Sequence, residues 1–114
     1  ELHWLESEAQ GATVAQAERK PMIVDFGAEW CAACKELALH TFADEKVREE
    51  AGRFVAVKVD ATDDEDPQIN AIKGKYKVVG LPTVVVLDSE GKEAVRFNEF
   101  VDADRFLAAI KTVN

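Results

Sequence analysis

The chain has 114 residues, of which 47% are apolar, and its 22 acidic and 14 basic side chains give a formal charge of -8. This length suits one compact domain, and the acidic balance disfavours nucleic acid, whose phosphates are bound by clustered Lys and Arg. No apolar run approaches the ~20 residues that cross a bilayer, and no signal peptide is recognisable. We therefore expect a soluble single domain over residues 1–114. Because the sequence begins at Glu1 rather than methionine, we expect it to be either a mature chain or a segment of a longer protein, such as a membrane-bound one.

The N-terminal segment predicts a short strand and then a helix. "HWL" at residues 3–5 is the strand candidate. Ser7, with Gln10 three residues later, resembles a capping box and begins the helix. Gly11 weakens this helix and Pro21 ends it.

Two strands and the helical region between them follow. "MIVDFG" at 22–27 and "FVAVKVD" at 54–60 are apolar and rich in β-branched residues, as is typical of buried strands. Residues 31–40 and 44–51 favour helix, and the weaker helix formers at 41–42 interrupt them.

The second half predicts a helix, a hairpin and a closing helix. Asp66 caps the first of these helices, and Pro67 occupies its first position. The strand candidates at 83–88 and 92–97 are joined by a short turn, in which Gly91 suits a positive φ. Asp102 caps the last helix. Its apolar face carries Phe106, Ala109, Ile110 and Val113.

Strands that alternate with helices and end in a hairpin predict an α/β domain. Its mixed sheet is expected to be flanked by helices on both faces.

Cys31 and Cys34 are the only cysteines, three residues apart, where the strand at 22–27 leads into the next helix. A sulfur at the start of a helix lies beside unpaired backbone N–H groups, which favour the thiolate. Residues three apart on a helix share a face, so this pair can close and open a disulfide with little backbone movement. The spacing is typical of a low-pKa redox couple.

Three other uses of the pair are weaker. A zinc site needs about four ligands, and His3 and His40 do not supply a second paired half, so we expect no metal. A structural disulfide over so short a loop would stabilise the fold little. Buried free thiols fit poorly beside Trp30, Glu29 and Lys35, which suggest an edge between core and water.

The segments "VDFGAEWCAACK", "VAVKVD" and "YKVVGLPT" resemble the thioredoxin superfamily in motif, order and spacing over nearly the whole chain. The stretch "AEWCAACKELALHTFADEKV" is most similar to the C-terminal periplasmic domains of DsbD-type membrane electron transporters. Ala32, Ala33 and Leu39 stand where ordinary thioredoxins have Gly-Pro and a helix-kinking proline. The resemblance implies a thioredoxin fold.

The resemblance also implies roles for residues around the cysteines. Cys31 matches the nucleophile, and Cys34 matches the resolving cysteine. Pro82 matches a cis-proline that faces the pair, and Leu81 before it would pair with an extended substrate segment.

Asp25 is unusual because it lies inside an apolar strand, where an unpaired carboxylate is costly. We expect it to have a partner or a raised pKa. By resemblance it is the buried acid that moves the proton of Cys34, with Lys58 nearby; the alternative is that it faces water or pairs with Lys58 for structure only. Trp30 matches the indole beside the cysteines, and Glu29 is an exposed neighbour. Ala38 stands where DsbD-type domains can carry a second acid.

The resemblance implies a protein-disulfide reductase that relays electrons without a bound cofactor, because the two sulfurs carry both electrons. Expected partners are disulfide-bearing proteins, including other domains of a DsbD-like transporter, and the domain is expected to be a monomer outside the membrane. We expect a periplasmic or other extracytoplasmic location rather than a cytoplasmic one. The alternatives are a freestanding disulfide isomerase or oxidase, and a thioredoxin-fold binding module without turnover.

Overall fold

The computed structural model describes residues 2–114, so Glu1 of the expected domain lies outside the described residues. A five-stranded sheet has the order β1-β3-β2-β4-β5. Its strands are β1 (Trp4–Leu5), β2 (Met22–Gly27), β3 (Val55–Asp60), β4 (Thr83–Leu87) and β5 (Glu93–Phe97). The first three strands are parallel to one another, β4 is antiparallel to β2, and β5 is antiparallel to β4. The predicted mixed sheet and its final hairpin are confirmed.

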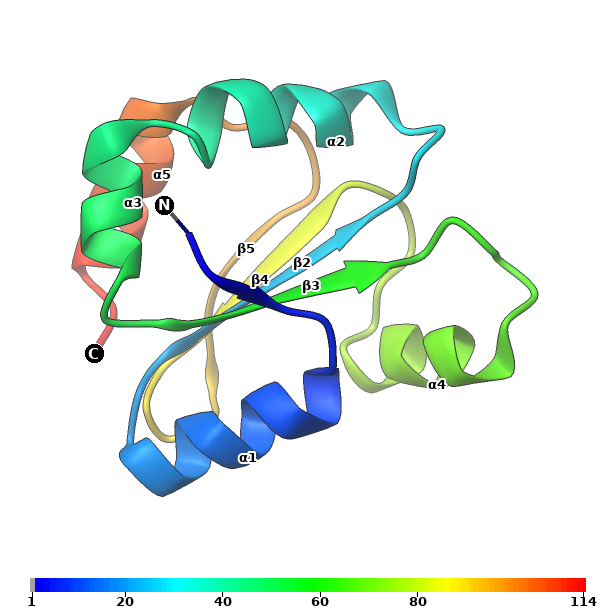
Figure 1. Cartoon of the computed structure of the whole chain (residues 1–114), viewed down its shortest axis with the longest axis horizontal. Coiled ribbons are helices and arrows are strands. Elements are labelled where there is room, and N and C mark those ends of the chain that lie inside the picture. The colour runs from blue at the N-terminus through cyan, green and yellow to red at the C-terminus, as the bar shows by residue number, and fades with distance from the viewer. Residues whose placement is uncertain (1) are drawn as a thin grey trace.

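Helices cover both faces of the sheet (Figure 1). One face carries α1 (Glu8–Glu18) and α4 (Pro67–Lys75). The other face carries α2 (Ala32–Glu36), the π-helical turn η1 (Leu37–Thr41), α3 (Glu45–Ala51) and α5 (Ala103–Lys111). Within residues 2–114, no helix is both long enough and apolar enough to cross a membrane.

The predicted capping residues begin their helices. Ser7 accepts a hydrogen bond from the Gln10 N–H at 3.1 Å, and Asp66 and Asp102 do the same for α4 and α5. These bonds satisfy backbone N–H groups that a helix leaves unpaired at its start. Gly91 has φ 83° in the turn between β4 and β5, as its position in the hairpin predicted.

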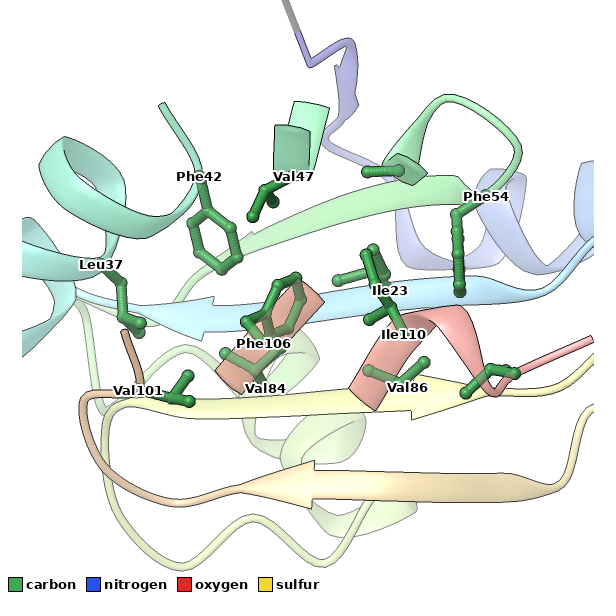
Figure 2. Packing of buried hydrophobic residues seen from close by; sticks show 12 residues of the cluster. Ile23, Leu37, Phe42, Val47, Phe54, Val84, Val86, Val101, Phe106 and Ile110 are labelled. Atoms are coloured by element: carbon green, nitrogen blue, oxygen red, sulfur yellow. The ribbon is translucent and has the colours of Figure 1, made fainter. Parts of the chain in front are cut away.

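The central strand β2 supplies side chains to two hydrophobic clusters, one on each face. Ile23 belongs to the cluster under η1, α3 and α5, and Val24 belongs to the cluster under α1 and α4. Figure 2 shows the first cluster, in which Phe106 of α5 lies over the sheet together with Phe42. Because side chains alternate along a strand, a strand covered on both faces is apolar at nearly every position, as the sequence of β2 is.

The helical region after the cysteines is interrupted at residues 42–44, close to the interruption predicted at 41–42, but the π-helical turn before it was not predicted. The chain continues from α2 into η1 without a break, and the Phe42 N–H donates to the Leu37 carbonyl, five residues back, at 2.8 Å. One inserted residue of this kind widens the helix locally and is often found near functional sites. Here the widened turn lies directly after the helix that carries Cys34.

Candidate functional site

The cysteine pair lies where the sequence placed it. Cys31 is the N-cap of α2, and its Sγ accepts a hydrogen bond from the Cys34 N–H at 3.2 Å. The two residues form a disulfide, with Cα atoms 5.3 Å apart. Cys31 keeps 7% of its surface exposed, and Cys34 is half-buried. A helix start that donates N–H groups to a sulfur stabilises the thiolate once the disulfide is reduced.

The end of β2 lies directly beside the sulfur of Cys34. A Cβ placed on Gly27 would lie 3.5 Å from both Cβ and Sγ of Cys34. The Gly27 carbonyl accepts a hydrogen bond from the Ala61 N–H at 2.7 Å, which joins this strand end to the segment after β3. The active-site loop therefore begins from a firmly held position.

The Leu81–Pro82 peptide bond is cis, as the resemblance implied. In the β2–β4 ladder, Phe26 pairs with Thr83. Pro82 therefore lies at the level of Gly27, at the end of the sheet that carries the cysteines. Leu81 is half-buried beside it.

Trp30 and Glu29 are held by Thr62, a residue that sequence reasoning missed. The Trp30 Nε1–H donates to the Thr62 carbonyl at 3.1 Å, and the Glu29 N–H donates to Thr62 Oγ1 at 2.9 Å. Hydrogen bonds from the Thr62 hydroxyl and N–H also lower the pKa of Asp60. The indole remains 64% exposed. The one sequence signal for Thr62 was its place just after the end of β3, where loops at the carboxyl edge of the sheet meet.

Asp25 is buried on β2, with 6% of its surface exposed. Burial raises the pKa of its carboxyl group to about 6, and the charge of Lys58 partly opposes this rise. Asp25 and Lys58 are register partners on β2 and β3, but the ion pairs formed by residues 2–114 do not include them. Of the two predictions for this residue, a raised pKa is confirmed, and a direct ion pair with Lys58 is absent from the described residues.

Asp25 and Cys34 line the same cavity, which has a volume of about 480 Å³. Cys34, Asp25 and Lys58 all line it, and so does Ala38. The cavity is large enough to hold water, and a water molecule between Cys34 and Asp25 would let a proton pass between them without direct contact.

A metal-ion site and a second cavity are the other possible functional features of the described residues. Among residues 2–114, no group of three or more His, Cys, Asp or Glu side chains is placed to hold a metal ion. A second cavity, of about 1030 Å³, lies among the ends of α1 and α4 and the β4–β5 hairpin, and no cysteine lines it. Of these two cavities, the smaller one is the one that a cysteine lines.

The chain matches known proteins over most of its length. The family model for a thioredoxin-like domain matches residues 9–114. The thiol:disulfide interchange protein DsbD of Yersinia pestis (strain Pestoides F) is 40% identical over 98 residues, which is 84% of this chain. The chain spans only 16% of the length of that relative.

Solved structures agree with this match. The crystal structure of the Neisseria meningitidis DsbD C-terminal domain in the oxidised form superposes with a TM-score of 0.79 and 27% identity, covering 98% of this chain and 100% of that one. A thioredoxin from Thermus thermophilus, at 24% identity, shares the fold with a TM-score of 0.82, covering 97% of this chain and 85% of that one. The chain belongs to the thioredoxin-like domain family.

Proposed function

We propose that this domain is a thiol–disulfide oxidoreductase that reduces disulfides of other proteins through Cys31 and Cys34. The observation that carries the proposal is the disulfide at the start of α2, where Cys31 Sγ accepts the Cys34 N–H. A disulfide placed at a helix start is poised for exchange, because the thiolate formed on reduction is stabilised there. The name of the Yersinia relative, a thiol:disulfide interchange protein, supports the same reaction.

The reaction has two exchange steps. The Cys31 thiolate attacks one sulfur of a partner disulfide, forms a mixed disulfide and releases the other partner sulfur as a thiolate. The Cys34 thiolate then attacks Cys31 Sγ, so that the Cys31–Cys34 disulfide forms and the second partner sulfur leaves. Two electrons pass from the domain to the partner, and no bound cofactor is needed.

Asp25 is the group best placed to take the Cys34 proton before the second step. Its carboxylate shares the cavity with Cys34, and its pKa of about 6 lies closer to neutral pH than that of an ordinary aspartate. A general base works best when its pKa lies near the operating pH. Lys58 assists by favouring the ionised form of Asp25.

The surface around the pair suits an extended segment of a protein partner. Trp30 is largely exposed, and so is Val79, at 97%, just before the cis-proline segment. The backbone of Leu81 would pair with such a segment, as strands are added to sheet edges in peptide recognition. Glu29 would border this surface next to the indole.

Because the DsbD relative is much longer than this chain, we infer that further domains accompany this one, and this supports a proposal on its partners and its location. Other domains of a DsbD-like transporter would exchange electrons with this one, which would act as a monomeric periplasmic domain of an inner-membrane protein. Its direct partners would be disulfide-bearing proteins rather than nucleic acid.

Insulin reduction tests the proposed reaction directly. The domain should accelerate the precipitation of insulin chains by dithiothreitol, and Cys31→Ser should abolish this acceleration. Cys34→Ala should instead accumulate a mixed disulfide on Cys31 that mass spectrometry detects. A reduced wild-type domain that reduces no protein disulfide, while it still binds partners, would support the binding-module alternative.

The reduction potential separates a reductase from an oxidase. We expect a value nearer that of thioredoxin, about -270 mV, than that of DsbA, about -120 mV. Equilibration with glutathione redox buffers measures it. A value close to that of DsbA would contradict the reductase proposal.

A further inference from the structure

Glu6 directly follows β1, the edge strand that pairs with β3, and among residues 2–114 it does not form an ion pair with Lys58. In the parallel β1–β3 ladder, Trp4 pairs with Ala56 and Leu5 pairs with Val57. The residue after Leu5 therefore comes to the level of Lys58, whose register partner on the other side is Asp25 of β2. Three neighbouring segments thus bring a carboxylate, an ammonium group and a second carboxylate to one level of the sheet.

Glu6 also lines the cavity that contains Asp25 and Cys34. Side chains at alternate positions of a strand share a face, and Trp4 packs on the face of the sheet that carries Ile23. The charged or titratable side chains around this cavity, besides the disulfide-bonded Cys34, are those of Glu6, Asp25, Glu29, Lys35, Lys58 and Asp60.

Of the cavity's other carboxylates, Asp60 already has partners, because it accepts hydrogen bonds from the N–H and hydroxyl of Thr62. Glu29 belongs to the loop that leads into Cys31. Glu6, one residue beyond the Leu5–Val57 pair, is the carboxylate that the β1–β3 register brings to the level of Lys58. The Lys58 ammonium lies 6.0 Å from the centre of the Trp4 ring, on the side of β3 from which Glu6 comes.

We propose that Glu6 is a positioning residue for the exchange reaction, because its carboxylate shares the Lys58 ammonium with Asp25 and so decides how readily Asp25 accepts the proton of Cys34. This inference rests on the proposed reductase function. On this proposal, Glu6 in the N-terminal segment controls the proton affinity of the Asp25 carboxyl group on the central strand β2.

The direction of the effect follows from the charges. The Lys58 charge lowers the pKa of Asp25, against the larger rise caused by burial. A carboxylate that attracts the same ammonium group weakens this lowering. Glu6→Gln therefore frees Lys58 to act on Asp25 alone, and the pKa of Asp25 should fall.

Carboxyl ¹³C NMR of the oxidised domain tests this without interference from thiol titration. In Glu6→Gln we expect the pKa of Asp25 to fall by about 0.3 to 0.5, a two- to threefold change in its ionisation constant. Glu49→Gln, the same charge change on an exposed residue of α3, is the matched control and should leave Asp25 unchanged. An unchanged Asp25 titration in Glu6→Gln would overturn the proposal.

A double-mutant cycle tests whether the effect passes through Lys58. In a Lys58→Met background, Glu6→Gln should shift the pKa of Asp25 by less than half as much as in the wild type. A shift of equal size in both backgrounds would show that Lys58 is not shared, and would overturn the proposal.

The reaction itself supplies the second readout. When the reduced domain reacts with an aromatic disulfide such as dithiobis(nitrobenzoate), one thiolate leaves as Cys31 attacks and a second leaves as Cys34 resolves. We expect Glu6→Gln, but not Glu49→Gln, to move the acid limb of the second phase to lower pH by the same 0.3 to 0.5 or so. If Asp25 shifts while this limb does not move, Glu6 has no part in the reaction.

Failure of the proposed function is recognised separately. It would appear as a wild-type domain that releases no second thiolate and reduces no insulin. The titration of Asp25 in the oxidised protein requires no turnover, so it reports on Glu6 and Lys58 in either case.

Discussion

Asp25 is an ionisable residue that is buried at the centre of the sheet. Its place within an apolar strand was enough to predict a partner or a raised pKa. The choice between them depended on the distance to Lys58 and on the cavity, which only the packed sheet defines. A carboxylate in this position destabilises the folded state whenever it is ionised, because burial removes the water that would solvate the charge.

The linkage between protonation and folding gives the pH dependence of this cost. The folded pKa of Asp25, about 6, lies above the ordinary value of 3.8. Between roughly pH 4 and pH 6 the folded state therefore binds more protons than the unfolded state, and stability falls as pH rises through this window. We expect Asp25→Asn to raise the free energy of unfolding of the oxidised domain by about 2 kcal/mol at pH 8.

Urea unfolding at two pH values measures this effect. At pH 4 the gain from Asp25→Asn should be well under ~1 kcal/mol, because the folded wild-type carboxyl group is then protonated. Equal gains at both pH values would mean that the folded pKa of Asp25 is not raised.

Gly11 shows how one contact reverses a prediction from helix propensity. The sequence marked this residue as a weak point of α1. A Cβ at this position would lie 2.3 Å from Val57 Cγ2, on a fully buried, β-branched side chain that cannot turn away. Among the glycines of the described chain, Gly11 leaves the least room for an added Cβ, because α1 packs closely on β3 at this point.

The substitutions Gly11→Ala and Gly74→Ala separate the effect of core packing on stability from the effect of helix propensity. Gly11→Ala should destabilise the protein by about 1–3 kcal/mol, because overpacking outweighs the gain in helix propensity. Gly74 lies in α4 with no atom within 4 Å of an added Cβ, so Gly74→Ala should stabilise by about 0.5–1 kcal/mol. Thermal unfolding of both variants checks the opposite signs, and a stabilising Gly11→Ala would contradict the close contact.

At the scale of elements, η1 joins the cysteine helix to the start of α5. Thr41, fully buried in η1, donates its hydroxyl to the Val101 carbonyl at 2.5 Å. The sequence suggested only that Thr41 is a weak helix former. Its partner is 60 residues away, so local pattern could not reveal the bond. This contact fixes the widened turn against the segment before α5.

Thr41→Val measures how much the hydrogen bond from Thr41 to the Val101 carbonyl stabilises the fold. The substitution keeps the shape of the side chain but leaves the Val101 carbonyl without its donor in the core, which should cost about 1–3 kcal/mol. Thr112 makes the same kind of bond to the Ala109 carbonyl at an exposed site, so Thr112→Val should change stability by less than ~0.5 kcal/mol. Guanidinium unfolding curves compare the two, and similar losses would show that burial of the Thr41 bond is unimportant.

For the whole molecule, the strands β2 and β4 each supply side chains to both clusters. Ile23 and Val24 are neighbours in sequence but belong to clusters on opposite faces, both with zero exposure. Because the same strands contribute to both clusters, we expect residues 2–114 to unfold as one cooperative unit, which is the behaviour of a single domain.

Substitutions on the two faces test this cooperativity. Ile23→Ala should cost about 2–5 kcal/mol and Val24→Ala about 2 kcal/mol, each by loss of buried methyl groups and the cavity left behind. In both variants, near-UV and far-UV circular dichroism should report the same urea midpoint. Separate midpoints in either variant would divide the chain into two folding units.

The order of the elements, the helix caps, the hairpin and the position of the cysteine pair could be predicted from the sequence, because each depends on residues within a few positions of one another. Ser7 with Gln10, and Asp66 with Pro67, are examples. The resemblance to thioredoxins added the cis bond before Pro82, which spacing alone does not reveal.

Only the tertiary structure revealed the contacts between distant segments: Thr62 with Trp30, Thr41 with Val101, Gly11 with Val57, and Glu6 at the level of Lys58. Local periodicity determines which side chains face the core, but not which of them meet there. Strand order and register bring distant residues together, and they also decide which charges surround Asp25. The sequence by itself therefore determined where the two sulfurs lie, and the packed sheet decided which ionisable groups lie near them.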